Sequence, residues 1–208
     1  MENTILGLFA VPIGNYTIDH KISNQEKSFL LSQKQKLNVA NETSINTHVL
    51  NDIILEPLRK EIEEKINFFV EQVYFPKYDV NLKITQSWIN YTKKGQSHHR
   101  HKHPNSFVSG VYYIETSDSD SIYFYNDRTP MIEVKSRHWG LLNSKIWCFP
   151  AKKGNLVLFP SSLEHSVSTV TTEKTRISLS FNTFPGKLGD DVDLTELNFE
   201  EVKKFIGD

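Results

Sequence analysis

The chain has 208 residues, of which 38% are hydrophobic and 12% aromatic, with only 9 Gly and 8 Pro. This composition excludes collagen-like, low-complexity and wholly disordered proteins, and the length suits a single compact domain. The 24 basic and 25 acidic side chains give a net charge of -1, so no overall field attracts nucleic acid or anionic lipid. We therefore expect neither a nucleic-acid partner nor a membrane partner.

Cysteine usage and the amino-terminal sequence bear on the compartment. Cys148 is the only cysteine, which excludes an internal disulfide and any Cys-x-x-Cys motif. The apolar stretch 5–13 follows Glu2 rather than a basic segment and contains Gly and Pro, unlike a signal peptide. No apolar run reaches membrane-spanning length. We expect a reducing compartment, namely the cytoplasm, or the host cytoplasm if the gene comes from a phage.

The first third of the chain predicts an arm followed by helices. Residues 6–18 are apolar but interrupted by Pro12 and Gly14, which favours an edge strand or an extended arm. Ser23-x-x-Glu26 has the form of a capping box, so a helix is expected to begin there. A clearer helix begins near Pro57, because apolar residues then recur at spacings of three and four: Leu58, Ile62, Ile66, Phe69 and Val73.

After Pro76 the pattern changes to short runs rich in β-branched and aromatic residues, separated by turn residues. Eight such runs predict a mostly β fold: a double-stranded β-helix, or cupin-like jelly roll, with the amino-terminal helices packed on one sheet. A short helix is expected after Leu194. The predicted strands are 80–91, 107–114, 121–125, 131–134, 145–149, 155–159, 166–170 and 175–181.

We interpret residues 1–208 as a single domain with three parts. Residues 1–76 form the arm and supporting helices, 77–184 the jelly-roll core, and 185–208 a carboxy-terminal extension. The chain has neither an internal repeat nor a linker-like segment. Its oligomeric state is left open by the sequence.

Four of the eight histidines fall within the segment HHRHKH, at His98, His99, His101 and His103. Residues two apart on a strand point to the same side, so His101 and His103 can offer two imidazoles to one ion. The pair formed by His99 and His101 has the same spacing. A solvated basic loop or an accidental tag-like cluster explains the segment equally well, so the evidence for a metal depends on its surroundings.

The surrounding motifs, taken together, resemble the iron(II)- and 2-oxoglutarate-dependent oxygenases. The resemblance is strongest to a prolyl-hydroxylase-like group of uncharacterised oxygenases from marine bacteria and their phages, and it covers roughly residues 85–184. The segments that carry it are 88–91 (WINY), Gly95, 101–114 (HKHPNSFVSGVYYI), 150–160 (PAKKGNLVLFP), 164–165 (EH) and 176–182 (RISLSFN).

The resemblance implies a set of site residues. The metal ligands would be His101, His103 and His165, and the residues that contact 2-oxoglutarate would be Tyr91, Tyr113, Arg176 and Ser178. Arginine suits the far carboxylate of 2-oxoglutarate, because its planar fork can donate two hydrogen bonds to one carboxylate. The implied cofactors are therefore Fe(II) and 2-oxoglutarate.

One position departs from the family pattern. Most members have Asp or Glu where this chain has His103, so the ligand set becomes three neutral imidazoles instead of two imidazoles and a carboxylate. The use of 2-oxoglutarate is accordingly less secure than the metal. As an alternative, a carboxylate from Glu115, Asp127 or Glu164 completes the metal shell, although none of them has the motif position.

Strand pairing provides an independent, weaker argument. If the chain turns between Thr172 and Glu173, an antiparallel hairpin places His165 opposite Ser180 and Arg176 opposite Thr169. All four side chains would then share one sheet face, with the His and Arg roughly 13 Å apart at about 3.3 Å per residue. We expect this hairpin. We also expect the acidic pair Asp118-x-Asp120 to lie in a solvated turn.

The activity implied by the resemblance is a hydroxylase. It would couple the decarboxylation of 2-oxoglutarate to succinate, with dioxygen, to the oxidation of a small-molecule or peptide substrate. Two hypotheses from other classes stay open. One is a non-catalytic jelly-roll module that binds a virion component or a carbohydrate; the other is a three-histidine cupin-type dioxygenase that does not use 2-oxoglutarate.

Overall fold

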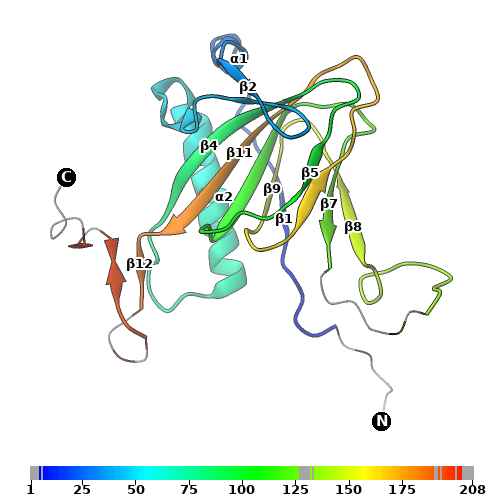
Figure 1. The fold of residues 1–208 in the computed structure, drawn as a ribbon. Coiled ribbons are helices and arrows are strands. Elements are labelled where there is room, and N and C mark those ends of the chain that lie inside the picture. Colours follow the sequence, from blue (N-terminus) through cyan, green and yellow to red (C-terminus); the bar gives the residue numbers. More distant parts are fainter. Residues whose placement is uncertain are drawn as a thin grey trace.

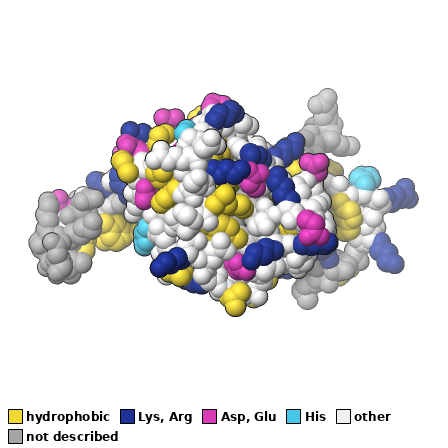
Figure 2. Space-filling view, turned by 90° about the horizontal axis from the view of Figure 1, so that it is seen from above, with side chains coloured by type: hydrophobic (Ala, Val, Ile, Leu, Met, Phe, Trp, Pro, Cys, Tyr) yellow, Lys and Arg dark blue, Asp and Glu magenta, His cyan; other side chains and the backbone are white. Residues whose placement is uncertain are grey.

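The computed structural model describes residues 5, 7–126, 132, 134–189, 192, 194–199 and 201–202. Two β-sheets face each other, and the helices cover the outer face of the larger sheet (Figure 1). This architecture is the predicted jelly roll. Basic and acidic side chains are interspersed on the face seen in Figure 2, in keeping with the net charge of -1.

The amino-terminal third contains the predicted arm strand and both predicted helices. Ser23 caps α1 as the sequence indicates: its hydroxyl accepts from the Glu26 backbone N–H at 3.2 Å, and the Glu26 carboxylate accepts from the Ser23 N–H at 2.7 Å. Two short strands that the sequence did not indicate, β2 and β3, lie between the helices. The elements are β1 (Gly14–Thr17), α1 (Asn24–Leu31), β2 (Gln35–Leu37), β3 (Glu42–Ser44), two 3₁₀ turns (Val49–Asn51 and Ile53–Leu55) and α2 (Glu56–Tyr74).

The remaining strands build the sandwich. They are β4 (Leu82–Thr92), β5 (His98–His101), β6 (Val108–Glu115), β7 (Ser121–Tyr125), β8 (Ile146–Pro150), β9 (Asn155–Pro160), β10 (His165–Val167), β11 (Arg176–Pro185), β12 (Lys187–Leu188) and β13 (Leu197–Asn198). The large sheet has the order β1-β9-β6-β11-β4-β3-β2, the small sheet β5-β10-β7-β8, and β12 pairs with β13. Antiparallel partners flank β11 on both sides, with β4 and β6 as its neighbours.

The large sheet buries both of its faces. Alternate residues of its strands point to opposite sides, so one set packs against α1 and α2 in an apolar core that includes Leu58, Ile62, Leu179 and Phe181. The other set faces the small sheet, where Val111, Tyr113 and Phe159 form a second, smaller core with Ile122 and Phe124. The space between the two sheets holds the candidate site.

The expected β10–β11 hairpin is wrong. β10 pairs with β5 and β7 in the small sheet, whereas β11 lies between β4 and β6 in the large sheet. The connecting residues therefore carry the chain from one sheet to the other. His165 and Arg176 therefore belong to different sheets instead of lying along one ladder.

Two other predicted elements fall largely outside the described residues. Of the predicted strand 131–134, Met131 and Glu133 are outside, and Ile132 and Val134 are not in a strand. The predicted carboxy-terminal helix extends into residues 203–208, which are also outside; before them, Phe199, Glu201 and Val202 have helical backbone. No helix among the described residues is long and apolar enough to span a membrane.

Candidate metal centre

A pocket lies between the two sheets. The small sheet contributes five residues to its wall, and the large sheet contributes polar residues from β4 and β11. The five are His98, His101, Ile122, His165 and Val167. Its complete lining is Trp88, Asn90, His98, His101, His103, Gly110, Val111, Ile122, Phe159, His165, Val167, Ser178 and Ser180.

Neighbouring segments bring three of the predicted histidines together. His101, on β5, is paired with His165, on β10, and His103 follows β5 with its backbone N–H donating to the Ser161 carbonyl at 3.0 Å. One ring nitrogen from each of the three histidines lies within 4.8 Å of the other two. The ring centroids are 4.3 Å apart for His101 and His165, and 5.1 Å apart for His103 and His165. We call His101, His103 and His165 the inner triad.

Backbone carbonyls fix which nitrogen two of these rings present. The Nδ1 atom of His101 donates to the His99 carbonyl at 2.8 Å, and Nδ1 of His165 donates to the Leu163 carbonyl at 3.0 Å. A carbonyl oxygen can only accept, so Nδ1 carries the proton and Nε2 keeps a free lone pair. A backbone carbonyl in this position is a common orienting partner of metal-binding histidines.

Burial keeps the triad neutral. Burial, followed by repulsion from His101, lowers the pKa of His103 to about 4 and that of His165 to about 3. Burial also lowers the pKa of His101. A cation entering at neutral pH therefore has no proton to displace from these rings, and three imidazole nitrogens form a donor set suited to iron, nickel, copper or zinc.

The carboxylates considered as alternative ligands lie elsewhere. Glu164 is paired with Arg100. Glu115 is paired with Lys27, Lys153 and Lys174; burial raises its pKa, but these ammonium groups outweigh that effect and bring it to about 2. Asp127 lies outside the described residues. Within the described part of the chain, no carboxylate joins the inner triad.

Arg176 is buried beside an acidic partner. Its side chain is 2% exposed, and Nη1 donates to the Asp120 carboxylate at 2.8 Å and to the Ser168 carbonyl at 2.9 Å. Asp120, 1% exposed, also accepts from the Ser117 backbone N–H at 2.8 Å. The expectation of a solvated turn is therefore wrong for Asp120: the turn folds this carboxylate inward, where it compensates a buried guanidinium.

Two polar atoms near this ion pair have no partner. Nη2 of Arg176 and the hydroxyl oxygen of Tyr113 are both fully buried, and neither makes a hydrogen bond. Burial raises the pKa of Tyr113, while the charge of Arg176 lowers it and that of Asp120 raises it further. Buried donors without acceptors are rare in folded proteins, so these two atoms are suited to an anionic ligand.

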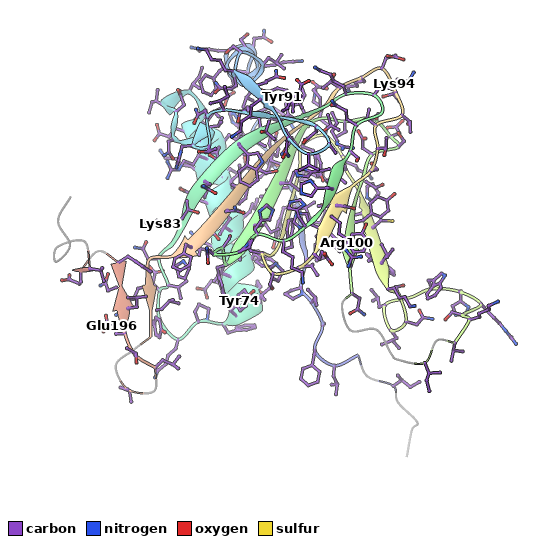
Figure 3. All side chains as sticks on the ribbon, in the orientation of Figure 1. Tyr74, Lys83, Tyr91, Lys94, Arg100 and Glu196 are labelled. Carbon is purple, nitrogen blue, oxygen red and sulfur yellow. The ribbon has the colours of Figure 1, made fainter. Side chains whose placement is uncertain are left out.

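The remaining predicted contacts differ from each other. Ser178 lines the pocket and lies two residues after Arg176, the first residue of β11. Tyr91 does not: its ring lies in the helix-side core and its hydroxyl donates to the Leu30 carbonyl at 2.5 Å, near α1 (Figure 3). The structure thus separates Tyr91 from the other predicted residues, because even-numbered residues of β4 face the pocket at this point.

The pocket also contains polar residues that the sequence interpretation missed. Asn90 occupies the place expected for Tyr91, and its amide donates to the Ser180 hydroxyl at 2.9 Å. Asn41, buried under β4, donates to the Asn90 side-chain oxygen at 3.4 Å. The alternation along β4 could have indicated this. Ile89 and Tyr91 share one face, which packs in the helix-side core, so Trp88 and Asn90 must share the face toward the pocket.

The sequence and the fold are both similar to known oxygenases. Residues 86–182 match the model of a protein family described as "Putative 2OG-Fe(II) oxygenase", where 2OG denotes 2-oxoglutarate. No protein with a curated description matches the sequence. Similar folds occur in HygX from Streptomyces hygroscopicus with nickel, 2-oxoglutarate and hygromycin B bound, at 12% identity, a TM-score of 0.58 and coverage of 84% of this chain and 83% of that one.

Two further solved structures have the same fold. A prolyl-4-hydroxylase from Pseudomonas putida is 12% identical with a TM-score of 0.56, over 84% of this chain and 94% of that one. A 2OG-Fe(II) oxygenase family oxidoreductase from Burkholderia pseudomallei is 13% identical with a TM-score of 0.54, over 76% and 75%. At these identities the solved structures establish the common jelly-roll fold, and the family model matches 97 of the 208 residues of this chain.

Proposed function

We propose that this chain, whose residues 86–182 match the 2OG-Fe(II) oxygenase family model, is a member of that family and an iron(II)- and 2-oxoglutarate-dependent hydroxylase. The observation that carries the proposal is the pairing of two features inside one sandwich. Three neutral imidazoles converge at one position, and two buried donors, Nη2 of Arg176 and the Tyr113 hydroxyl, have no acceptor at another. A metal fits the first feature and a carboxylate fits the second.

His101, His103 and His165 hold the iron through one ring nitrogen each. The carbonyls of His99 and Leu163 keep the Nδ1 protons of two rings in place, so the Nε2 lone pairs are oriented before the metal arrives. Three protein ligands leave coordination positions free for small molecules. When bound, iron and 2-oxoglutarate together supply the oxidising chemistry: dioxygen and 2-oxoglutarate give succinate and CO₂ while one oxygen atom is inserted into a C–H bond of the substrate.

Arg176 and Tyr113 receive the far carboxylate of 2-oxoglutarate. Nη1 of Arg176 is already bound to Asp120 and Ser168, so Nη2 is the donor that remains, and Tyr113 offers its hydroxyl proton. A carboxylate has two oxygen atoms and satisfies both donors at once. Ser178 adds a hydroxyl from the pocket wall.

The charges support three histidines in place of a carboxylate ligand. Asp120 places one negative charge inside the protein, beside Arg176. With neutral imidazoles, the metal dication, the 2-oxoglutarate dianion, Arg176 and Asp120 together carry no net charge. A carboxylate at position 103 would leave an extra negative charge in the buried site, which is unfavourable. Asp120 therefore supplies the negative charge that a carboxylate ligand at position 103 would otherwise supply.

The wall around the triad is apolar. Phe159 packs on His165 with ring centroids 4.5 Å apart, and Trp88 packs on His103 at 5.8 Å. These rings exclude water from one side of the metal position, which protects the protein and the substrate from unproductive oxidation. A small molecule or a peptide side chain is the substrate class that such a pocket admits. We place the reaction in the cytoplasm, because the single cysteine suits a reducing compartment.

The test is an anaerobic titration with Fe(II) and 2-oxoglutarate, followed by the visible metal-to-ligand charge-transfer band. The band is expected in the wild-type protein and not in His165→Ala, while the exposed His138→Ala control keeps it. Absence of the band in the wild type, or its persistence in His165→Ala, contradicts the proposal.

The three-histidine ligand set favours one second candidate, a dioxygenase that does not use 2-oxoglutarate. This candidate rests on His103, which stands where most family members have a carboxylate. The two functions differ in product: only the proposed hydroxylase converts 2-oxoglutarate to succinate. Succinate formation in aerobic incubations with Fe(II) and 2-oxoglutarate, which often proceeds slowly without a substrate, therefore decides between them.

A further inference from the structure

A second group of histidines adjoins the inner triad. His98, His99 and His101 each offer one ring nitrogen, and these atoms also lie within 4.8 Å of one another. The rings of His98 and His101 are stacked, with centroids 4.6 Å apart and planes at 14°, and those of His99 and His101 are 4.9 Å apart. All three residues are partly exposed, whereas the inner triad contains the buried His165. We call His98, His99 and His101 the outer triad.

A β-bulge explains why these residues converge. His101 is paired with His165 and His98 with Val167, so four consecutive residues of β5 oppose three of β10. In a regular strand, residues three apart point to opposite sides, and His98 would face away from His101. The extra residue in β5 changes the direction of the strand locally, and both rings are turned toward the pocket.

Two nitrogen atoms define what the outer triad can bind. Nδ1 of His99 is buried and makes no hydrogen bond, so the structure leaves a polar atom unsatisfied within this cluster. Nδ1 of His101 is occupied by the His99 carbonyl, so Nε2 is the atom that His101 has left to offer. Both triads therefore need the same nitrogen, and a cation held by one triad excludes a cation from the other.

We infer that the outer triad is a second, overlapping site for a late first-row divalent cation such as Zn²⁺, Ni²⁺ or Cu²⁺. Imidazole-only ligand sets suit these ions, and the order of affinities places them at or above iron(II). Occupation of the outer triad withdraws His101 from the inner triad. The site itself is independent of the proposed function, and its consequence, displacement of iron, rests on that function.

The first experiment measures Zn²⁺ binding by competition with a chromophoric chelator. His165→Ala removes the inner triad, and this variant is expected to retain one Zn²⁺ per chain. Combining it with His99→Ala weakens the retained affinity at least tenfold, while combining it with the exposed His138→Ala leaves the affinity unchanged. Failure of His165→Ala to bind Zn²⁺, or equal affinities with and without His99, overturns the inference.

The second experiment uses proteins with an intact inner triad, so it does not depend on how His165→Ala folds. Zn²⁺ is added anaerobically to the Fe(II) and 2-oxoglutarate complexes of wild type and His99→Ala. Both show the charge-transfer band, and His99→Ala requires at least about five times more Zn²⁺ for half-loss, because only direct exchange at the inner triad remains. Equal Zn²⁺ sensitivity overturns the inference. A wild type without the band contradicts the proposed function instead, and the chelator experiment still decides on the outer triad.

Discussion

The two faces of the large sheet use the same strands for opposite purposes. On the helix side, β11 contributes Leu179 and Phe181, which are fully buried in the apolar core that also includes residues of α2. On the inner side, the same strand contributes Arg176 and Ser178, and buried polar atoms there lack partners. One face is complete without a ligand and the other is not. The difference indicates that the helix side holds the fold together while the inner side is prepared for a ligand.

The largest expected effect comes from the helix side. Phe181→Ala deletes a fully buried ring and should lower the free energy of unfolding by about 3–5 kcal/mol. Urea denaturation checks the value. The matched control is the neighbouring Ser180→Ala, which changes the inner face and loses only the hydrogen bond from Asn90, a cost of about 1 kcal/mol. Similar losses of unfolding free energy in the two variants would show that the helix side does not contribute more to stability than the inner side.

The inner face should make stability depend on pH. Metal-free His103 and His165 have folded pKa values of about 4 and about 3, below the unfolded value of about 6.5. Because the unfolded state then binds more protons, their contribution to stability is present above pH 6.5 and is lost as the pH falls toward their folded values. For two histidines the loss between pH 6.5 and 5.5 is about 2 kcal/mol.

His165→Ala tests that pH dependence. Urea denaturation of the metal-free proteins should show a loss about 1 kcal/mol smaller in this variant than in the wild type over the same interval. The exposed His138→Ala serves as the control and should follow the wild type. A wild-type stability that does not change between pH 6.5 and 5.5 would mean that folding does not lower the pKa values of these histidines.

The Asp120–Arg176 pair should determine how well the inner face receives a carboxylate. Asp120→Ala removes the acceptor of Nη1 and frees the guanidinium to turn, so the affinity for 2-oxoglutarate should fall about tenfold, or about 1.4 kcal/mol. Asp120→Asn keeps an oxygen in the same place and should stay within about threefold of the wild type. Titration of the charge-transfer band measures both.

A shorter cosubstrate tests whether the effect of Asp120 depends on the far carboxylate of 2-oxoglutarate. A 2-oxo monocarboxylic acid lacks the far carboxylate, so Asp120→Ala and the wild type should bind it equally. If Asp120→Asn loses as much 2-oxoglutarate affinity as Asp120→Ala, the negative charge of Asp120 matters and its position does not.

The sequence predicted the elements well and their partners poorly. Capping at Ser23 and the apolar spacing of α2 are local features, so both helices follow from local physics. A period of two identifies a strand but does not say which sheet it joins, and this is why β10 and β11 were paired wrongly. In β4 both faces are buried, and the family resemblance assigns Tyr91 to the pocket without saying which face it is on, whereas the structure places Asn90 there.

The histidines were more predictable than the groups around Arg176. The inner triad depends on residue types that stand out in a sequence, and the structure brings those three residues together. Asp120 is inconspicuous, because an acidic residue in a turn is ordinarily solvated. Only the crossing of the chain between the two sheets places it beside Arg176, 56 positions away. Long-range pairing of this kind has no local pattern.

The smallest effect is also the sharpest test of the difference between the faces. One substitution, Tyr113→Phe, should leave stability unchanged or slightly raised while it lowers the affinity for 2-oxoglutarate. Tyr113→Phe removes a buried hydroxyl that has no partner, so the ligand-free protein should be as stable as the wild type or slightly more stable. The same change removes a donor to the far carboxylate, and the affinity for 2-oxoglutarate should fall about three- to tenfold, equivalent to about 0.7–1.4 kcal/mol. Tyr91→Phe is the matched control on the helix side. Its hydroxyl already donates to Leu30, so this variant should lose about 1 kcal/mol of stability and no 2-oxoglutarate affinity. If both tyrosine variants lose stability and neither loses affinity, the unpaired atoms near Arg176 are not a carboxylate site.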